Sequence, residues 1–176
     1  MTIAATQASR EPAENESIYL HSSRWDELLA PASGFPNLSL SEHKGELWLM
    51  ETTTSKLVTV GNRHLAKLGI WTANVRGIDY HEADARATDT TPGTALEIKR
   101  EPDNPHDRNA IAVLAEGKPI GYYNKQMAAK LAKLMDAGLV LESIALAGSP
   151  RGKNDSRIQI LAADPAVIRH LKSAHI

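Results

Sequence analysis

The stretch of sequence from residue 100 to residue 122 is REPDNPHDRNAIAVLAEGKPIGY, and it decides the expected fold. Its first half sets two closely spaced prolines among Asp and Asn residues, a composition typical of a rigid polar turn. Its second half is apolar and is interrupted by Glu116-Gly117, which predicts a β-hairpin with strands at 110–115 and 119–123. We therefore expect a stiff polar turn beside a tight hairpin.

Segments with strand character flank this stretch on both sides, and one strong helix interrupts them. We expect further strands at 72–80, 94–99, 139–147 and 157–162. Asn124 is a typical helix N-cap and Gly138 a typical stop signal, so a helix is predicted from Lys125 to Ala137. A last helix is predicted over 166–172, after Asp164-Pro165.

This order of elements predicts an α+β fold that is mainly β. We expect a small, modified OB-like barrel of about six short strands, with a packed helix and a C-terminal helix. Residues 1–17 lack apolar periodicity and predict a disordered tail, whereas residues 18–69 predict an N-terminal extension and residues 70–176 the main domain. The extension is expected to contain a short helix at 24–30, opened by a capping box at Ser23, and a strand pair at 46–50 and 56–60.

Composition excludes several classes of protein. The 176 residues include 20 Lys and Arg against 21 Asp and Glu, a net charge of −1, which excludes a uniformly basic nucleic-acid coat but allows a local basic face. The chain has no cysteine, which excludes disulfide bonds, thiol catalysis and thiolate zinc sites. It has no apolar run near the ~18 residues of a membrane span and no secretory signal. We therefore expect a cytoplasmic protein that needs no membrane, cofactor or metal.

Three motifs, in order and with compatible spacing, resemble the HIRAN domain over about residues 75–163. They are Gly77-Ile78-Asp79-Tyr80, then the turn from Pro102 to Ala110, then Gly121-Tyr122-Tyr123 before the predicted helix. The resemblance implies a modified OB-type fold that binds DNA. In members attached to fork-remodelling ATPases, it implies a site for the 3′ end of single-stranded DNA, where aromatic rings stack on terminal bases and a carboxylate binds the 3′-hydroxyl.

The candidate nucleic-acid-binding residues follow from these motifs and from side-chain chemistry: Tyr80, Asn104, His106, Asp107, Tyr122 and Lys125. Tyrosines offer stacking surfaces, although they also occur as half-buried barrel residues. Strand alternation places Tyr122 and Tyr123 on opposite faces, and we expect Tyr122 to be the exposed one.

The polar candidates each have a specific chemistry. The resemblance assigns Asp107 to the 3′-hydroxyl, because a carboxylate accepts a bond from a hydroxyl but repels a phosphate. His106 stands where the family commonly has an aromatic residue, and imidazole can also stack. Asn104 belongs to the same Asn-Pro-x-Asp turn, and Lys125 opens a helix, where a phosphate is well placed. For each of these residues, a purely structural or solvated role is the alternative.

Charge and departures from the family pattern qualify this interpretation. Five basic residues fall between Arg108 and Lys133 against the single acid Glu116, and the 148–157 loop adds Arg151, Lys153 and Arg157. That loop either follows a phosphate backbone or is an ordinary solubilising loop. Asp79 occupies a position where DNA-binding relatives have a basic residue, and residues 145–148 lack the relatives' aromatic.

Three functional hypotheses remain open. The first is a non-catalytic module that binds single-stranded DNA or its 3′ end in DNA repair or replication-fork processing. The second is an adaptor that docks a helicase or nuclease through Trp25, Phe35 and Trp48, unless these rings close a satellite core. The third is a small hydrolase or nuclease that uses Asp103, His106 and Asp107. A Walker loop does not occur, and the polar run from His81 to Asp89 is interpreted as a loop rather than a metal site.

Overall fold

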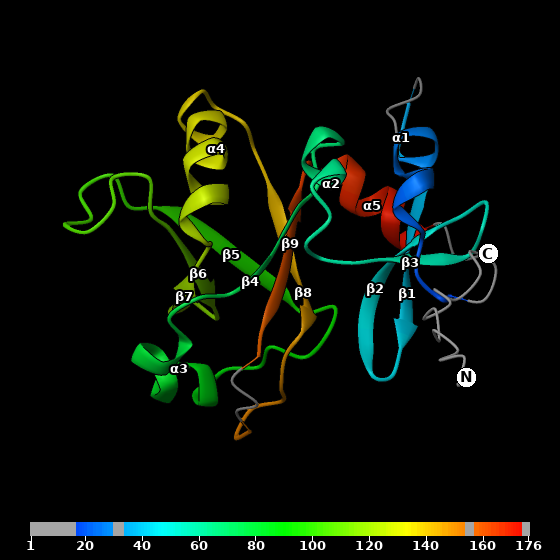
Figure 1. Ribbon diagram of the computed structural model, residues 1–176. Coiled ribbons are helices and arrows are strands. Elements are labelled where there is room, and N and C mark those ends of the chain that lie inside the picture. Colours follow the sequence, from blue (N-terminus) through cyan, green and yellow to red (C-terminus); the bar gives the residue numbers. More distant parts are fainter. Residues whose placement is uncertain (1–16, 30–33, 154–156, 174–176) are drawn as a thin grey trace, which may run out of the picture.

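The computed structural model describes residues 17–29, 34–153 and 157–173. It contains two antiparallel sheets, one of six strands in the order β4-β9-β8-β5-β6-β7 and one of three strands in the order β1-β2-β3. Figure 1 shows the large sheet curling into a half-barrel beside helix α4, with the small sheet and α5 on the opposite side of β8 and β9. The mainly β architecture with about six strands in the barrel sheet confirms the predicted fold class.

The element bounds are as follows. The large sheet consists of β4 (Trp71–Asn74), β5 (Ala95–Arg100), β6 (Ile111–Ala115), β7 (Lys118–Tyr122), β8 (Glu142–Ala147) and β9 (Gln159–Ala163). The small sheet consists of β1 (Leu38–His43), β2 (Glu46–Glu51) and β3 (Lys56–Val58). The helices are η1 (Ser22–Arg24), α1 (Trp25–Leu28), α2 (His64–Lys67), η2 (Ile78–His81), α3 (Glu82–Ala87), α4 (Lys125–Asp136) and α5 (Pro165–Ser173).

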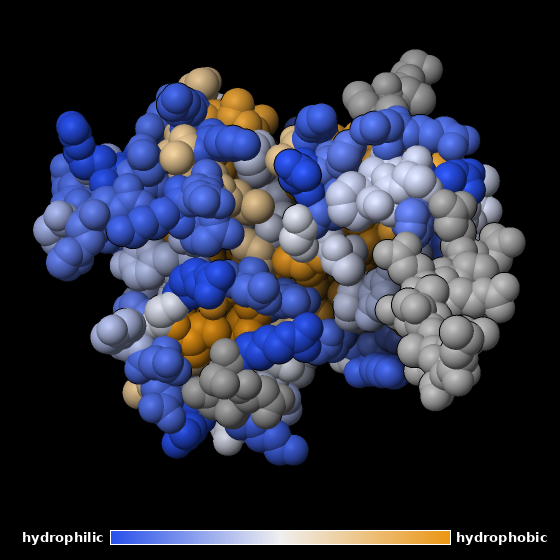
Figure 2. All heavy atoms as spheres, viewed as in Figure 1, coloured by the Kyte–Doolittle hydropathy of each residue, from blue (hydrophilic) through white to orange (hydrophobic). Residues whose placement is uncertain are grey.

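Strands β8 and β9 are buried on both faces, because each separates two hydrophobic cores. Ala145 and Ile160 face a first core with α4, whereas their neighbours Leu146 and Leu161 face a second core with the small sheet and α5. This explains why both strands are apolar almost throughout rather than alternating with polar residues. Figure 2 shows hydrophilic side chains over most of one face, with hydrophobic residues in view mainly in hollows between them.

Several local predictions are confirmed. Helix α4 begins after Asn124, whose side chain accepts a hydrogen bond of 2.9 Å from the backbone N–H of Met127. The β6–β7 hairpin turns at Glu116 and Gly117, which have φ angles of 51° and 77°, as a two-residue hairpin turn requires. The last helix starts at Pro165, as the predicted cap at Asp164 and first-turn proline require, and ends at Ser173.

Other predictions are wrong. The strand expected at 72–80 ends at Asn74. Arg76 pairs with Tyr122 instead, and Gly77, in a left-handed conformation (φ 75°), then turns the chain into η2. The polar run that follows forms helix α3 rather than a loop. Strand β1 was not predicted, since its serines conceal the apolar alternation, although Ser39 itself is buried.

The N-terminal helix also differs from its prediction. It is split into η1 and the four-residue α1, and the cap is His21, whose ring accepts from the N–H of Ser23. The predicted end of this helix at residue 30 and almost all of the predicted tail at 1–17 lie outside the described residues. The division of the chain at residues 69 and 70 stays a prediction. Within the described ranges, no helix is both long and apolar enough to span a membrane.

Candidate functional site

One cavity brings together all six candidate residues. We call it the tyrosine cavity. It has a volume of about 530 Å³ and is formed by three segments of the chain. Its lining residues are Arg76, Gly77, Tyr80, Asn104, His106, Asp107, Ala110, Tyr122, Tyr123, Asn124 and Lys125. The three motifs that lie far apart in the sequence therefore converge on one site.

The polar turn before β6 is organised by Asn104. Its Oδ1 accepts hydrogen bonds from the backbone N–H groups of His106 (2.9 Å) and Asp107 (3.2 Å). Its Nδ2 donates to Oε1 of Glu101 at 3.0 Å. Asn104 thus stiffens the turn with most of its side-chain hydrogen-bonding capacity, while His106 is left exposed on the cavity rim.

Asp107 has one engaged and one open oxygen. Its Oδ1 accepts a hydrogen bond of 2.9 Å from the backbone N–H of Asn109. Across the part of the chain that the structure describes, Oδ2 has no hydrogen-bond partner. The side chain is half-buried and lines the tyrosine cavity, and one of its two oxygens remains available as an acceptor.

The adjacent tyrosines Tyr122 and Tyr123 have opposite environments. Tyr123 is 3% exposed, and its hydroxyl donates to the carbonyl of Trp71 at 3.1 Å; burial raises its pKa. Tyr122 is half-buried, and its hydroxyl donates to Glu101 at 2.9 Å; burial and then this hydrogen bond raise its pKa. The predicted alternation is confirmed, with Tyr123 in the core and Tyr122 at the cavity wall.

Tyr80 is the most exposed aromatic side chain of the cavity, at 91%. It lies in η2 rather than at a strand end, which corrects the sequence-based prediction of its setting. The neighbouring His81 ring lies 6.1 Å from the ring of Tyr122, measured between centroids. Arg76, Gly77 and Tyr80 thus form the wall of the cavity beside β7.

A pair of backbone hydrogen bonds holds this wall in place. Arg76 and Tyr122 exchange N–H···O bonds of 2.8 Å in both directions. Next to this pair, a Cβ atom at Gly121 would lie 2.5 Å from the carbonyl oxygen of Arg76. A side chain at position 121 would therefore force β7 away from Arg76. Glycine at position 121 therefore allows β7 to approach the backbone of residues 75 and 76 closely.

Two cations without ion pairs line the tyrosine cavity. The side chains of Arg76 and Lys125 are exposed, and neither forms a salt bridge within the described residues. Sequence reasoning missed Arg76, and its one signal is its place directly before the Gly77 motif. Asp79, which was expected to weaken phosphate binding, is exposed but is not among the lining residues.

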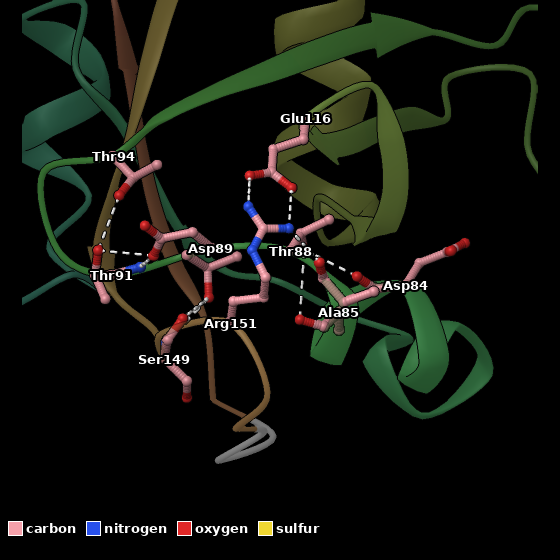
Figure 3. Close-up of polar contacts among 11 residues, drawn as sticks. Asp84, Ala85, Thr88, Asp89, Thr91, Thr94, Glu116, Ser149 and Arg151 are labelled. Carbon is pink, nitrogen blue, oxygen red and sulfur yellow. Dashed lines mark hydrogen bonds and ion pairs between the residues drawn. The ribbon is translucent and has the colours of Figure 1, made fainter.

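The loop after β8 contains two arginines that, unlike Arg76 and Lys125, form ion pairs with carboxylates. Figure 3 shows the Arg151 guanidinium bridging to Glu116, and Arg151 also donates to the carbonyl of Ala87 at the end of α3. Arg157 is paired with Glu46 in the small sheet. The hydrogen bond from Arg151 lowers the pKa of Glu116. These pairs favour a structural role for the loop over a phosphate-binding one, and its residues 154–156 lie outside the described ranges.

The residues proposed for hydrolysis do not form a compact acid cluster. Asp103 is exposed and is not among the residues that line the tyrosine cavity with Asp107 and His106. Over residues 17–29, 34–153 and 157–173, no group of three or more His, Asp or Glu residues is arranged to hold a metal ion.

Comparisons with known proteins point to one domain family. The sequence profile of the HIRAN domain matches residues 68–159. The HIRAN domain of human HLTF is similar, with a TM-score of 0.42 and 24% identity over 58% of this chain and 83% of that one. The same domain in its DNA-bound conformation has a TM-score of 0.39 and 23% identity over 58% of this chain and 82% of that one. A protein from Lactobacillus plantarum has a TM-score of 0.40 and 24% identity over 52% of this chain and 91% of that one. Among curated proteins there is no match. Because the profile covers more than half of the sequence, the chain belongs to the HIRAN domain family.

Proposed function

We propose that the protein is a nucleic-acid-binding module and that the tyrosine cavity takes the 3′ end of a single strand of DNA. The observation that supports this most directly is the convergence of an exposed tyrosine, an open carboxylate oxygen and two cations without ion pairs in one cavity. A base, a terminal hydroxyl and a phosphate are the ligand groups that match these three features.

Stacking supplies the first part of the binding energy. The ring of Tyr80 is 91% exposed, and the half-buried ring of Tyr122 belongs to the same cavity. Stacking of a base on an aromatic side chain contributes about 1–3 kcal/mol and does not depend strongly on the sequence of the strand. The cavity therefore binds terminal bases without selecting one of them.

The open oxygen of Asp107 supplies selectivity for an end. It accepts a hydrogen bond from a 3′-hydroxyl, whereas a 3′-phosphate in the same place would meet like charge. Arg76 and Lys125, on the same cavity, attract the phosphates that link the terminal nucleotides. A strand interior has no free hydroxyl of this kind in DNA, so the ends are preferred.

Membership of the HIRAN family supports a nucleic-acid ligand, since the HIRAN domain of HLTF has been solved in a DNA-bound conformation. The proposed role is DNA repair or replication-fork processing, in the cytoplasm and without catalysis by this chain. A helicase or nuclease that works on the same strand is the partner we propose.

The adaptor function has weaker support. Trp25 packs against the second core, and Trp48 lies in a half-buried position with its ring centroid 5.8 Å from that of Tyr19. Phe35 is 55% exposed and stacks on His170 with a centroid distance of 4.9 Å. Two of the three rings on which a docking surface depended are therefore at least half-buried in this chain's own structure.

The deciding experiment measures fluorescence anisotropy of a short labelled strand at low salt. One strand ends in a free 3′-hydroxyl and the matched strand ends in a 3′-phosphate. We expect the 3′-phosphate to weaken binding about tenfold, because one hydrogen bond to a charged acceptor is replaced by repulsion. Equal binding of the two strands would contradict end recognition, and no binding of either would contradict the nucleic-acid function.

A further inference from the structure

A second cavity lies next to the tyrosine cavity and is formed in part by the N-terminal extension. It has a volume of about 380 Å³, and its lining includes the 60–63 segment, β4 and the first half of α4. Figure 1 shows α2 and α4 on either side of β4 at this place. We call it the arginine groove. Arg76 and Asn124 line both cavities, so the two are neighbours with a shared wall.

The arginine groove has the chemistry of a phosphate-binding surface. Its lining contains Arg63, Arg76 and Lys130, which are all exposed and which form no salt bridge within the residues that the structure describes. Its lining contains no Asp or Glu among those residues. Cations that are not neutralised by neighbours keep their full attraction for an anion.

Asn62 adds a hydrogen-bond donor to the lining of this groove. The residue is 6% exposed, and its Oδ1 accepts a hydrogen bond of 2.9 Å from the backbone N–H of His64. That bond orients the side chain, and its Nδ2 has no partner in the described ranges. An amide donor that lines a groove and has no partner in the protein is free to bind an acceptor of a ligand.

We propose that the arginine groove binds the sugar–phosphate backbone of the strand whose end lies in the tyrosine cavity. Arg63 and Asn62 lie outside the residues 68–159 that match the family, so the extension is part of the binding surface of this chain. This inference rests on the proposed function. It assigns the nucleotides on the 5′ side of the bound 3′ end to a path along β4, past Arg76 and toward Arg63.

The test compares two strands with a free 3′-hydroxyl, one of about three nucleotides and one of about ten. Arg63→Ala is expected to weaken binding of the longer strand about fivefold and to lower the slope of log K against log salt by about 0.7, the value for one phosphate contact on a single strand. Binding of the short strand is expected to stay unchanged. Lys130→Ala, on the opposite wall, is expected to behave in the same way.

Arg169→Ala is the matched control, because Arg169 is an exposed arginine on α5 that lines neither cavity. Thermal unfolding of each variant checks that the fold is intact. If the unsubstituted protein binds neither strand, the proposed function fails and this inference fails with it. If it binds both strands but Arg63→Ala behaves like Arg169→Ala, or weakens both strands equally, only the arginine groove is overturned.

Discussion

Two turns of this protein place a carboxylate among backbone N–H groups, yet they use it differently. At the end of β2, Glu51 is 0% exposed and accepts hydrogen bonds from the N–H groups of Thr53 (2.9 Å) and Thr54 (2.7 Å) and from the Thr54 hydroxyl (2.7 Å). In the turn before β6, Asp107 lines the tyrosine cavity and accepts one bond, from Asn109, while its other oxygen has no partner among the described residues.

This difference separates a structural carboxylate from one that is available to a ligand. Burial by itself would raise the pKa of Glu51, but the hydrogen bonds from Thr54 and Thr53 outweigh it and lower that pKa. The charge of Glu51 is therefore used within the fold. The free acceptor of Asp107 contributes little to folding, so substitutions should affect stability at Glu51 and binding at Asp107.

The largest effect is expected for Glu51→Ala. The loss of its acceptors leaves the N–H groups of the turn without partners, which should lower the free energy of unfolding by about 2–3 kcal/mol. Urea denaturation measures this loss, and strand affinity at a temperature where the variant is folded should be unchanged. A variant as stable as the parent would show that Glu51 is not a structural carboxylate.

Tyr80→Ala tests the binding side of the comparison. Removal of an exposed stacking ring should weaken strand binding by about 1–3 kcal/mol, without a change in thermal unfolding. Tyr19→Ala is the control, because Tyr19 is also exposed but lies outside the tyrosine cavity. Equal losses of affinity in the two variants would contradict a specific role for Tyr80.

Asp107→Asn should remove the preference for a 3′-hydroxyl over a 3′-phosphate, at a cost to hydroxyl-strand affinity of about 1–2 kcal/mol. Asparagine keeps an acceptor for the N–H of Asn109, so the turn should remain folded. Asp103→Asn, in the same turn but outside the cavity lining, provides the comparison. Retention of the preference in Asp107→Asn would assign end recognition to another group.

Glu51 should contribute to the pH dependence of stability, as should Asp89, Glu116 and Asp136, whose pKa values are also lowered in the folded protein. The pKa of Glu51 is lower in the folded protein than its usual 4.5, so the unfolded chain takes up its proton first as the pH falls. Its stabilising contribution is therefore present above about pH 4.5 and is lost as the pH falls through the folded pKa. The free energy of unfolding, measured by urea denaturation from about pH 7 to about pH 3, should depend less on pH in Glu51→Gln than in the unsubstituted protein.

The smallest effect on binding is expected for Arg151→Ala. This cation already pairs with Glu116, so its loss should leave strand affinity and salt dependence unchanged. Arg76→Ala, which removes a cation without an ion pair from the cavity, should weaken binding about fivefold in the same assay. A loss in Arg151→Ala as large as that in Arg76→Ala would place the strand on the loop as well.

The parts of the structure that local chemistry determines could be predicted from the sequence. The cap at Asn124, the turn at Glu116-Gly117 and the opposite faces of Tyr122 and Tyr123 each depend on residues within a few positions of one another. The convergence of the six candidate residues on one cavity came from the family motifs, since no local pattern indicates which distant segments meet.

The parts that failed depend on distant partners or on one backbone conformation. Arg151 and Arg157 were counted as a basic loop, but their acids lie 35 and 111 positions away in the chain. Gly77 could have continued a strand, and only its left-handed conformation shows that the chain turns into η2 there. Arg76 was overlooked because it looks like any exposed arginine until the bonds to Tyr122 place it on the cavity.

The second core has a consequence for the order of folding during synthesis. It joins Leu20 of the extension to Leu171 of α5, across the outer face of β8 and β9. A ribosome that adds about 5–20 residues per second would expose the extension for several seconds before its partners emerge. The small sheet therefore cannot complete this core until α5, the last helix that the structure describes, has been synthesised.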